Sequence, residues 1–148
     1  VKNIFEASKQ YSCSIIYPED VITSKSLDGI PEPKKLNDIS DDDMILDIGE
    51  KTIKKIDNLI NSSKTILWNG PAGYFENNEF ANGSFQIAKS IVKNHKSNSI
   101  YSVAGGGDTI SVLNKINAIE GFNFISTAGG AFLEYLEGKE IPGISALN

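Results

Sequence analysis

The stretch Ser-Ile-Tyr-Ser-Val-Ala-Gly-Gly-Gly-Asp-Thr, residues 99–109, joins an apolar run to a glycine-rich turn. The run at residues 99–104 is short and apolar nearly throughout, which is typical of a strand buried on both faces of a parallel sheet. Beyond the turn, Ile110, Leu113 and Ile116 recur at helical spacing. The segment therefore predicts a buried strand, a tight turn and a helix in direct succession.

The same succession recurs along the chain. Further strands are predicted at residues 13–17, Met44–Ile48, Thr65–Trp68 and residues 122–126. Apolar residues at helical spacing join Ile53 to Ile60, Ala81 to Val92 and Leu133 to Leu136. This alternation predicts an α/β fold with three layers, αβα, around a doubly wound and mostly parallel sheet of Rossmann-like type. The proline-containing residues 18–43 break the pattern and predict a long surface excursion with one short strand at residues 21–23.

Size and composition restrict the possible functions. A chain of 148 residues has the size of one domain, and no apolar run approaches the ~18 residues of a membrane helix. The net charge of -5 argues against nucleic acid or an anionic membrane as the main partner. All 14 basic residues are lysines, so a phosphate has to be held by backbone N–H groups, a metal ion or lysine rather than by an arginine fork.

Two reactive residue types occur once each. The single cysteine, Cys13, excludes an internal disulfide framework and indicates a reducing compartment. Its place in a predicted apolar strand indicates a buried and inert thiol. The single histidine, His95, lies at a polar helix end, where interaction with the helix C-terminus is favoured over catalysis.

Three glycine-containing turns follow three of the predicted strands, at residues 69–76, 105–109 and 127–130. The carboxyl ends of parallel strands meet at one edge of a sheet, where α/β proteins bind ligands. Glycine lets backbone N–H groups approach a ligand closely, and a helix N-terminus favours anions. Together the turns predict a site for a polyphosphate.

Each turn taken alone also has a structural explanation. Residues 105–107 fit a tight turn with Asp108 or Thr109 as the N-cap of the next helix. Residues 127–130 suit close packing of a helix on a sheet, and residues 69–71 are typical of a simple turn. The expected convergence of all three at one edge is what favours a binding site.

Two acids stand out in these turns. Asp108 would repel a phosphate unless a cation lay between them, which predicts that Asp108 is a ligand of Mg²⁺. Glu76 is placed to accept hydrogen bonds from ribose hydroxyls, although a solvated loop acid fits equally well. Tyr74 and Phe75 can wall an adenine, but core packing is the commoner use of such residues.

The three turns contain no lysine, whereas phosphoryl transfer needs positive charge besides one metal ion. The chain is therefore either a binding module or part of a larger site. A dinucleotide-binding oxidoreductase is a weaker alternative, because Ile110 takes the last glycine position of a G-x-G-x-x-G turn.

Four ordered motifs resemble the phosphoglycerate kinase family. They are ILWNGPAGYFE at residues 66–76, GGGDT at 105–109, STAGGAFLEYLEGK at 126–139 and PG at 142–143. The resemblance is dense from about Met44 onward and looser before it. It implies a two-domain glycolytic kinase of the cytoplasm, monomeric when intact. Such an enzyme transfers a phosphoryl group between 1,3-bisphosphoglycerate and Mg-ADP, giving 3-phosphoglycerate and ATP.

The resemblance also implies roles for individual residues. Those expected to contact ADP or ATP are Asn69, Gly70, Pro71, Tyr74, Glu76, Gly105, Gly106, Gly107, Asp108 and Thr109. Those expected at the transferring phosphoryl group, and so in catalysis, are Gly106, Thr127, Gly129 and Gly130. Within the first set, Glu76 falls on the ribose contact and Asp108 on the Mg²⁺ ligand.

The chain departs from the family pattern in two ways. Ala128 stands where many members carry glycine, and Phe132 where many carry serine. The N-terminal domain with its basic phosphoglycerate site, the glycine–lysine nucleotide segment and the catalytic lysine are absent from the sequence. We therefore expect residues 1–148 to form part of the nucleotide-binding C-terminal domain, incomplete at its N-terminal side and inactive alone. The alternative is a self-contained, non-catalytic nucleotide-binding module.

Overall fold

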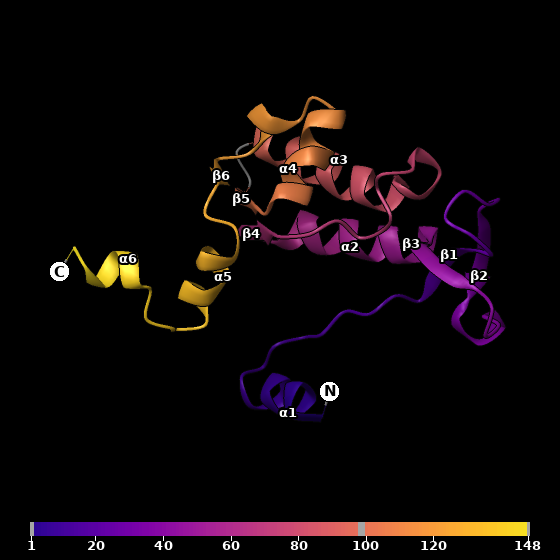
Figure 1. The fold of residues 1–148 in the computed structure, drawn as a ribbon, viewed down its shortest axis with the longest axis horizontal. Helices are drawn as coiled ribbons and strands as arrows, with labels where there is room; N and C mark the ends of the chain where they lie inside the picture. Colours follow the sequence, from indigo (N-terminus) through magenta and orange to yellow (C-terminus); the bar gives the residue numbers. More distant parts are fainter. Residues whose placement is uncertain (1, 98–99, 148) are drawn as a thin grey trace.

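The computed structural model describes residues 2–97 and 100–147 and contains two separate three-stranded sheets (Figure 1). The parallel sheet has the order β4 (Thr65–Trp68), β5 (Tyr101–Gly105), β6 (Phe124–Ser126). Helices flank this sheet, so the predicted α/β class is confirmed. Ser99, which was expected in the middle strand, lies outside the described residues.

Three predicted helices cover one face of the parallel sheet. They are α2 (Glu50–Ser62), α3 (Asn82–Lys96) and α4 (Gly107–Lys115). Their apolar residues join the buried side chains of the strands in one core. In that core Trp68 of β4 stacks on Phe122, with ring centroids 6.2 Å apart. Short 3-10 turns, η2 (Asn78–Phe80) and η3 (Ile119–Gly121), close the ends of this layer.

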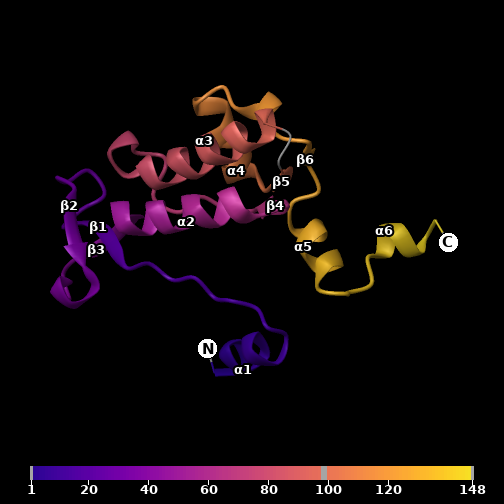
Figure 2. The same ribbon diagram turned by 180° about the vertical axis from the view of Figure 1, so that it is seen from behind.

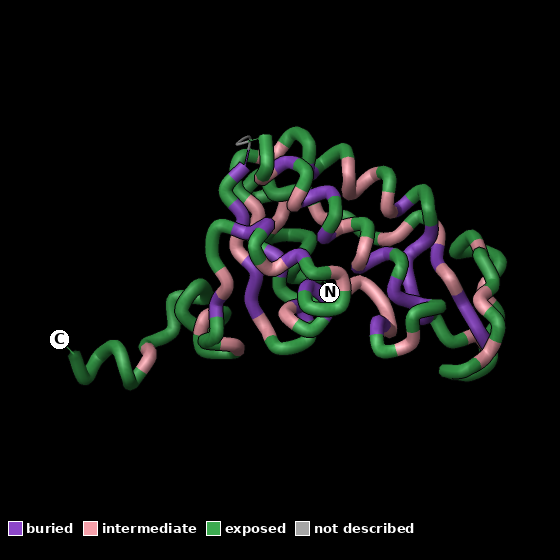
Figure 3. Tube along the Cα trace, turned by 90° about the horizontal axis from the view of Figure 1, so that it is seen from above, coloured by how far each residue is buried: buried purple, intermediate pink, exposed green. Residues whose placement is uncertain are grey.

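The opposite face of the parallel sheet is exposed. Leu67, Val103 and Phe124 form one row across the three strands, and Phe124 keeps 56% of its surface in solvent. Tyr101, which also lies on this face, is 53% exposed. Parallel sheets are normally covered on both faces. The described residues thus supply one helical layer and the sheet, and the chain ends are mostly exposed while the buried segments lie in the body of the molecule (Figure 3).

The second sheet is antiparallel and corrects two expectations. It has the order β2 (Glu32–Lys35), β1 (Asp20–Ser24), β3 (Met44–Ile48). The strand Met44–Ile48 is found as predicted, but it does not belong to the parallel sheet. Residues 18–43 contain two strands rather than one within a loose excursion. The strand predicted at residues 21–23 is confirmed as part of β1.

Ion pairs hold the connection between β2 and β3. The 3-10 turn η1 (Leu36–Asp38) lies in this connection. The Asp43 carboxylate lies 2.7 Å from Lys34 Nζ and 2.9 Å from Lys25 Nζ. The Lys34 ammonium, an N–H bond from Ser40 and the Lys25 ammonium hold the pKa of Asp43 far below its usual range. The ion pairs of Asp43 thus hold together the connection between β2 and β3, whose apolar residues do not by themselves predict a sheet.

The N-terminal segment differs most from expectation. Helix α1 (Lys2–Gln10) stands apart from the rest of the chain in both views (Figures 1 and 2), and it has no buried residue. The strand predicted at residues 13–17 is wrong, because that segment pairs with no described strand and has no regular secondary structure. Cys13 is accordingly exposed rather than buried. An apolar, β-branched run forms a strand only where a neighbour supplies hydrogen bonds.

The C-terminal segment consists of two short helices, α5 (Gly130–Leu136) and α6 (Pro142–Ser145). Neither has a buried residue, and Figure 2 shows them extending away from the sheets. The helix predicted from Leu133 and Leu136 is confirmed as α5. Among the described residues, no helix combines the length and apolar character needed to cross a bilayer.

A side chain from the antiparallel sheet caps α2. The Asp20 carboxylate accepts hydrogen bonds from Lys51 N (3.0 Å), Thr52 N (2.9 Å) and Thr52 Oγ1 (2.7 Å). The helix starts after Gly49, which offers no side chain for this purpose. Partial burial raises the pKa of Asp20, but these hydrogen bonds outweigh it and leave the pKa below its usual value of 3.8. Asp20 therefore joins the two halves of the molecule as an ionised cap.

We expect Asp20→Asn to lower the free energy of unfolding at pH 7 by about 1 kcal/mol, because the amide keeps only one of the two acceptor oxygens and lacks the charge that strengthens these hydrogen bonds. Because the folded pKa lies below the unfolded value, this contribution is present above pH 3.8 and is lost as the pH falls through the folded pKa. Urea unfolding at pH 7 and pH 3 measures the difference, with the exposed Asp41→Asn as a matched change of charge. If the difference in the free energy of unfolding between Asp20→Asn and wild type is the same at pH 7 and pH 3, Asp20 does not act as an ionised cap.

Candidate functional site

The three glycine turns lie at one edge of the parallel sheet, as predicted. Trp68 pairs with Ala104, and Gly105 pairs with Ser126, so the three strands end at the same level. The turns continue directly from these ends. The predicted convergence of the three glycine turns at one edge of the parallel sheet is therefore confirmed.

Close contacts join the turns after β4 and β5. A Cβ atom added to Gly106 would lie 3.1 Å from Asn69 Oδ1, and one on Gly105 would lie 3.3 Å from the same atom. The N–H of Gly70 donates to Thr109 Oγ1 at 2.7 Å. The glycines of the β5 turn thus give the side-chain carbonyl of Asn69 room for a close approach, which a Cβ atom would crowd.

The third turn reaches the same place through α5. The Phe132 ring lies 3.6 Å from where a Cβ atom on Gly105 would stand. Thr127 and Gly130 are exposed, and no atom lies within 4 Å of a Cβ added to Gly129 or Gly130. The third turn therefore packs on the second turn through Phe132 and leaves its glycines open to solvent.

Backbone conformation explains two of the glycines. Gly106 has φ 90° and precedes α4, and Gly129 has φ 53° and precedes α5. Residues with side chains rarely adopt these values. The conformation turns the chain sharply from strand to helix, so the first N–H groups of α4 face the space beyond the sheet edge. A Cβ atom added to Gly107 would meet nothing within 4 Å, which shows that this space is open.

Asp108 lies in the first turn of α4 and is exposed. Within residues 2–97 and 100–147, no group of three or more histidine, cysteine, aspartate or glutamate side chains is arranged to hold a metal. Mg²⁺ is commonly bound by one or two carboxylates together with phosphate oxygens and water. The residues present therefore fit an ion shared with a phosphate, rather than a cage made by the protein alone.

The β4 loop, residues 69–76, runs between the sheet edge and the start of α3. Ala72 N donates to Ser84 Oγ at 2.9 Å, and Tyr74 N donates to Leu46 O at 2.7 Å. Phe75 is buried in the core, as the commoner use of such a residue predicts, whereas Glu76 is exposed. The backbone of the loop is thus fixed at Ala72 and Tyr74, and Glu76 is open to solvent.

The sequence did not reveal one residue that contacts this loop. Lys115, at the end of α4, donates to Phe75 O at 2.8 Å and to Glu76 O at 3.2 Å. Thr109 was expected near phosphate, but it is fully buried and its hydroxyl accepts a hydrogen bond from the β4 loop. The only sequence signal for Lys115 is its place in the last turn of the predicted helix.

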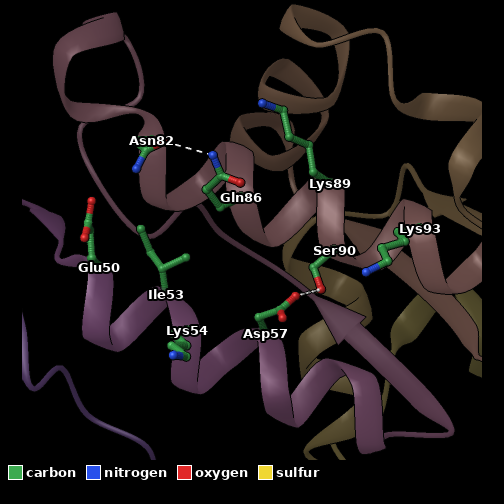
Figure 4. Close-up of a pocket in the computed structure, with 9 residues that line it drawn as sticks. All are labelled: Glu50, Ile53, Lys54, Asp57, Asn82, Gln86, Lys89, Ser90 and Lys93. Atoms are coloured by element: carbon green, nitrogen blue, oxygen red, sulfur yellow. Dashed lines mark hydrogen bonds between the residues drawn. The ribbon is translucent and has the colours of Figure 1, made fainter.

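A separate groove of about 490 Å³ lies between α2 and α3 (Figure 4), and none of its lining residues belongs to the glycine turns. Its lining carries both charges, including Glu50, Lys54 and Lys89. Ser90 of α3 donates to Asp57 of α2 across its floor. This groove is the seam between two packed helices.

Comparison with known proteins decides the family. The family model described as phosphoglycerate kinase matches residues 1–139. The chain belongs to the phosphoglycerate kinase family. The match includes residues 1–43, where the sequence motifs of phosphoglycerate kinase are less dense.

Individual phosphoglycerate kinases agree with this assignment. The phosphoglycerate kinase of Zymomonas mobilis is 43% identical over 149 residues, which cover 99% of this chain and 38% of the relative. The structure of phosphoglycerate kinase from Coxiella burnetii has a TM-score of 0.86 at 35% identity, covering 93% of this chain and 35% of that protein. The enzyme from Pyrococcus horikoshii has a TM-score of 0.80 at 32% identity, with 99% and 35% coverage. The chain thus spans little more than a third of the phosphoglycerate kinases that it matches.

Proposed function

We propose that this chain supplies the ADP- and ATP-binding half of a cytoplasmic phosphoglycerate kinase. The reaction moves a phosphoryl group between 1,3-bisphosphoglycerate and Mg-ADP, giving 3-phosphoglycerate and ATP. The observation that carries the proposal is the meeting of three glycine turns at one sheet edge, with Asp108 at the start of α4. Under this proposal residues 1–148 are part of the C-terminal domain, and the phosphoglycerate site lies in a separate N-terminal domain.

Two parts of the chain would bind different parts of the nucleotide. The N–H groups of Gly106, Gly107 and Asp108 lie where an anion at the N-terminus of α4 would accept them. Asn69, Gly70, Pro71 and Tyr74 of the β4 loop would face the nucleoside, with Glu76 accepting from ribose hydroxyls.

Asp108 would hold Mg²⁺, which when bound neutralises charge on the phosphate oxygens. Gly106, Thr127, Gly129 and Gly130 would border the transferring phosphoryl group. Their open backbone lets donors approach it closely.

The three turns supply no lysine to stabilise charge on the moving group. We therefore expect residues 1–148 alone to bind Mg-ADP weakly and to show no turnover. Calorimetric titration with Mg-ADP measures the first, and a coupled assay with 3-phosphoglycerate and ATP measures the second. Tighter binding of NAD than of ADP would contradict the proposed nucleotide site, and measurable turnover would contradict the expectation that residues 1–148 are inactive alone.

A further inference from the structure

The β4 loop is held at four places by partners of two kinds. Three of its N–H groups, at Gly70, Ala72 and Tyr74, donate to the protein beneath. These acceptors belong to buried residues, since Ser84 and Thr109 are fully buried and Leu46 is nearly so. The end of the loop is different, because there two carbonyl oxygens accept hydrogen bonds from a single charged side chain.

That side chain is Lys115. Its ammonium donates to Phe75 O at 2.8 Å and Glu76 O at 3.2 Å, and it lies 5.5 Å from the centre of the Phe75 ring. None of the ion pairs found among the described residues involves Lys115. Its positive charge is therefore directed at the loop backbone, where charge-assisted hydrogen bonds are about twice as strong as neutral ones.

Hydrogen bonds to two successive carbonyls restrict the orientation of the loop backbone as well as its distance from α4. Phe75 O belongs to the peptide unit before the Cα atom of Glu76, and Glu76 O belongs to the unit after it, so the two hydrogen bonds orient both planar units. The direction of the Cα–Cβ bond of Glu76 follows from these two planes. Since Phe75 is anchored in the core, Lys115 removes the freedom that remains at Glu76.

The position of Lys115 on α4 links the two ends of the site. Asp108 lies in the first turn of this nine-residue helix, and Lys115 is its last residue. The helix rises ~1.5 Å per residue, so the Cα atoms of the two residues are separated by about 10 Å along it.

We propose that Lys115 is a positioning residue for recognition of the ribose of a nucleoside diphosphate. It acts through Glu76 and does not touch the ligand itself. One rigid helix would then set the Mg²⁺ ligand Asp108 at one end and the orientation of the ribose acceptor Glu76 at the other. This inference rests on the proposed nucleotide site.

The test uses Lys115→Met, which keeps the length of the side chain and removes the ammonium. Calorimetry compares Mg-ADP with its 2′,3′-dideoxy analogue, which lacks the hydroxyls that Glu76 would bind. We expect Lys115→Met to weaken Mg-ADP binding about tenfold, in line with loss of charge-assisted hydrogen bonds, and to leave the dideoxy analogue unaffected. Lys115→Arg, which keeps donors and charge, should restore most of the ADP affinity.

Two further measurements separate positioning from a general loss of structure. As a single change, Glu76→Gln should weaken ADP binding. In combination with Lys115→Met it should cause no further loss of ADP affinity, because both changes disrupt the same contact between Glu76 and the ribose. Amide hydrogen exchange without ligand should be faster at residues 74–77 in Lys115→Met and unchanged in the core strands.

The outcomes are distinct. Equal weakening of ADP and the dideoxy analogue, or ADP affinity equal to wild type in Lys115→Met, would overturn the positioning role while leaving the nucleotide site in place. Failure of the wild-type chain to bind ADP at all would overturn the proposed function and this inference with it.

Discussion

Asp108→Ala is expected to remove most of the gain in ADP affinity that Mg²⁺ provides. Asp108 lies in the first turn of α4, and under the proposed function its carboxylate would be the protein's contribution to an ion otherwise held by phosphate oxygens and water. Its loss should weaken binding of Mg-ADP by at least about tenfold, since charge-assisted contacts are involved. Calorimetry at a fixed excess of Mg²⁺ measures the effect.

The same variant should behave in the opposite way without metal. When a chelator removes Mg²⁺, the Asp108 carboxylate of the wild type faces the phosphates directly and repels them. Asp108→Ala should then bind free ADP at least as tightly as the wild type. A structural role would weaken binding under both conditions. The exposed Asp41→Ala, which makes the same change of charge far from the glycine turns, serves as the control, and equal Mg-ADP affinity in Asp108→Ala and wild type would remove the metal role.

The parts of the fold that follow from local pattern were predictable. The strand Thr65–Trp68, the glycine turns and helices α2 to α5 were found from apolar spacing and turn chemistry. Parallel strands place their carboxyl ends at one edge whatever the details of packing. The convergence of the site residues therefore needed no knowledge of side-chain contacts.

The parts that depend on distant partners were not predictable. Met44–Ile48 forms the expected strand, yet its antiparallel pairing is set by β1, and no pattern within the strand specifies its neighbour. Residues 13–17 have the same apolar character and form no strand, because no described strand lies beside them. Apolar pattern reports burial tendency, whereas strand identity needs a hydrogen-bonding neighbour.

The supporting contacts of the site escaped prediction for a related reason. Lys115 meets the β4 loop across a separation of 39 to 40 residues, and Asp20 caps α2 across 31 to 32 residues. Charged side chains on the surface of a helix look alike in sequence whether they face solvent or a neighbouring loop. Their roles become visible only when the chain is folded.

A buried acid beneath the β4 loop shows how closely that loop is fitted. Asp47, the residue before the last of β3, is 2% exposed and accepts hydrogen bonds from Gly83 N at 2.8 Å and Ile48 N at 2.8 Å. Burial raises the pKa of Asp47 above its usual value, although the two N–H groups oppose this shift. The loop crosses this acid at Gly73, where no side chain fits.

We expect Gly73→Ala to destabilise the protein by ~1–3 kcal/mol, the usual cost of overpacking, and to weaken ADP binding as well. The added Cβ would lie 2.6 Å from Asp47 Oδ1, 2.6 Å from Leu46 O and 2.7 Å from Phe80 O. Two of these atoms belong to the backbone and cannot rotate away. The loop has to lift from β3 instead, which breaks the bond from Tyr74 N to Leu46 O and displaces Glu76.

Urea unfolding and Mg-ADP calorimetry measure the two effects of Gly73→Ala, and amide exchange at Tyr74 reports whether the loop has lifted. Gly143→Ala is the matched control, since a Cβ atom there meets nothing within 4 Å. Stability unchanged in Gly73→Ala would show that the loop does not depend on contact with β3. Reduced stability with unchanged ADP affinity would show instead that the height of the loop above Asp47 does not control the nucleotide contacts. Only a loss of both stability and ADP affinity supports a site whose geometry depends on the contact between the β4 loop and β3.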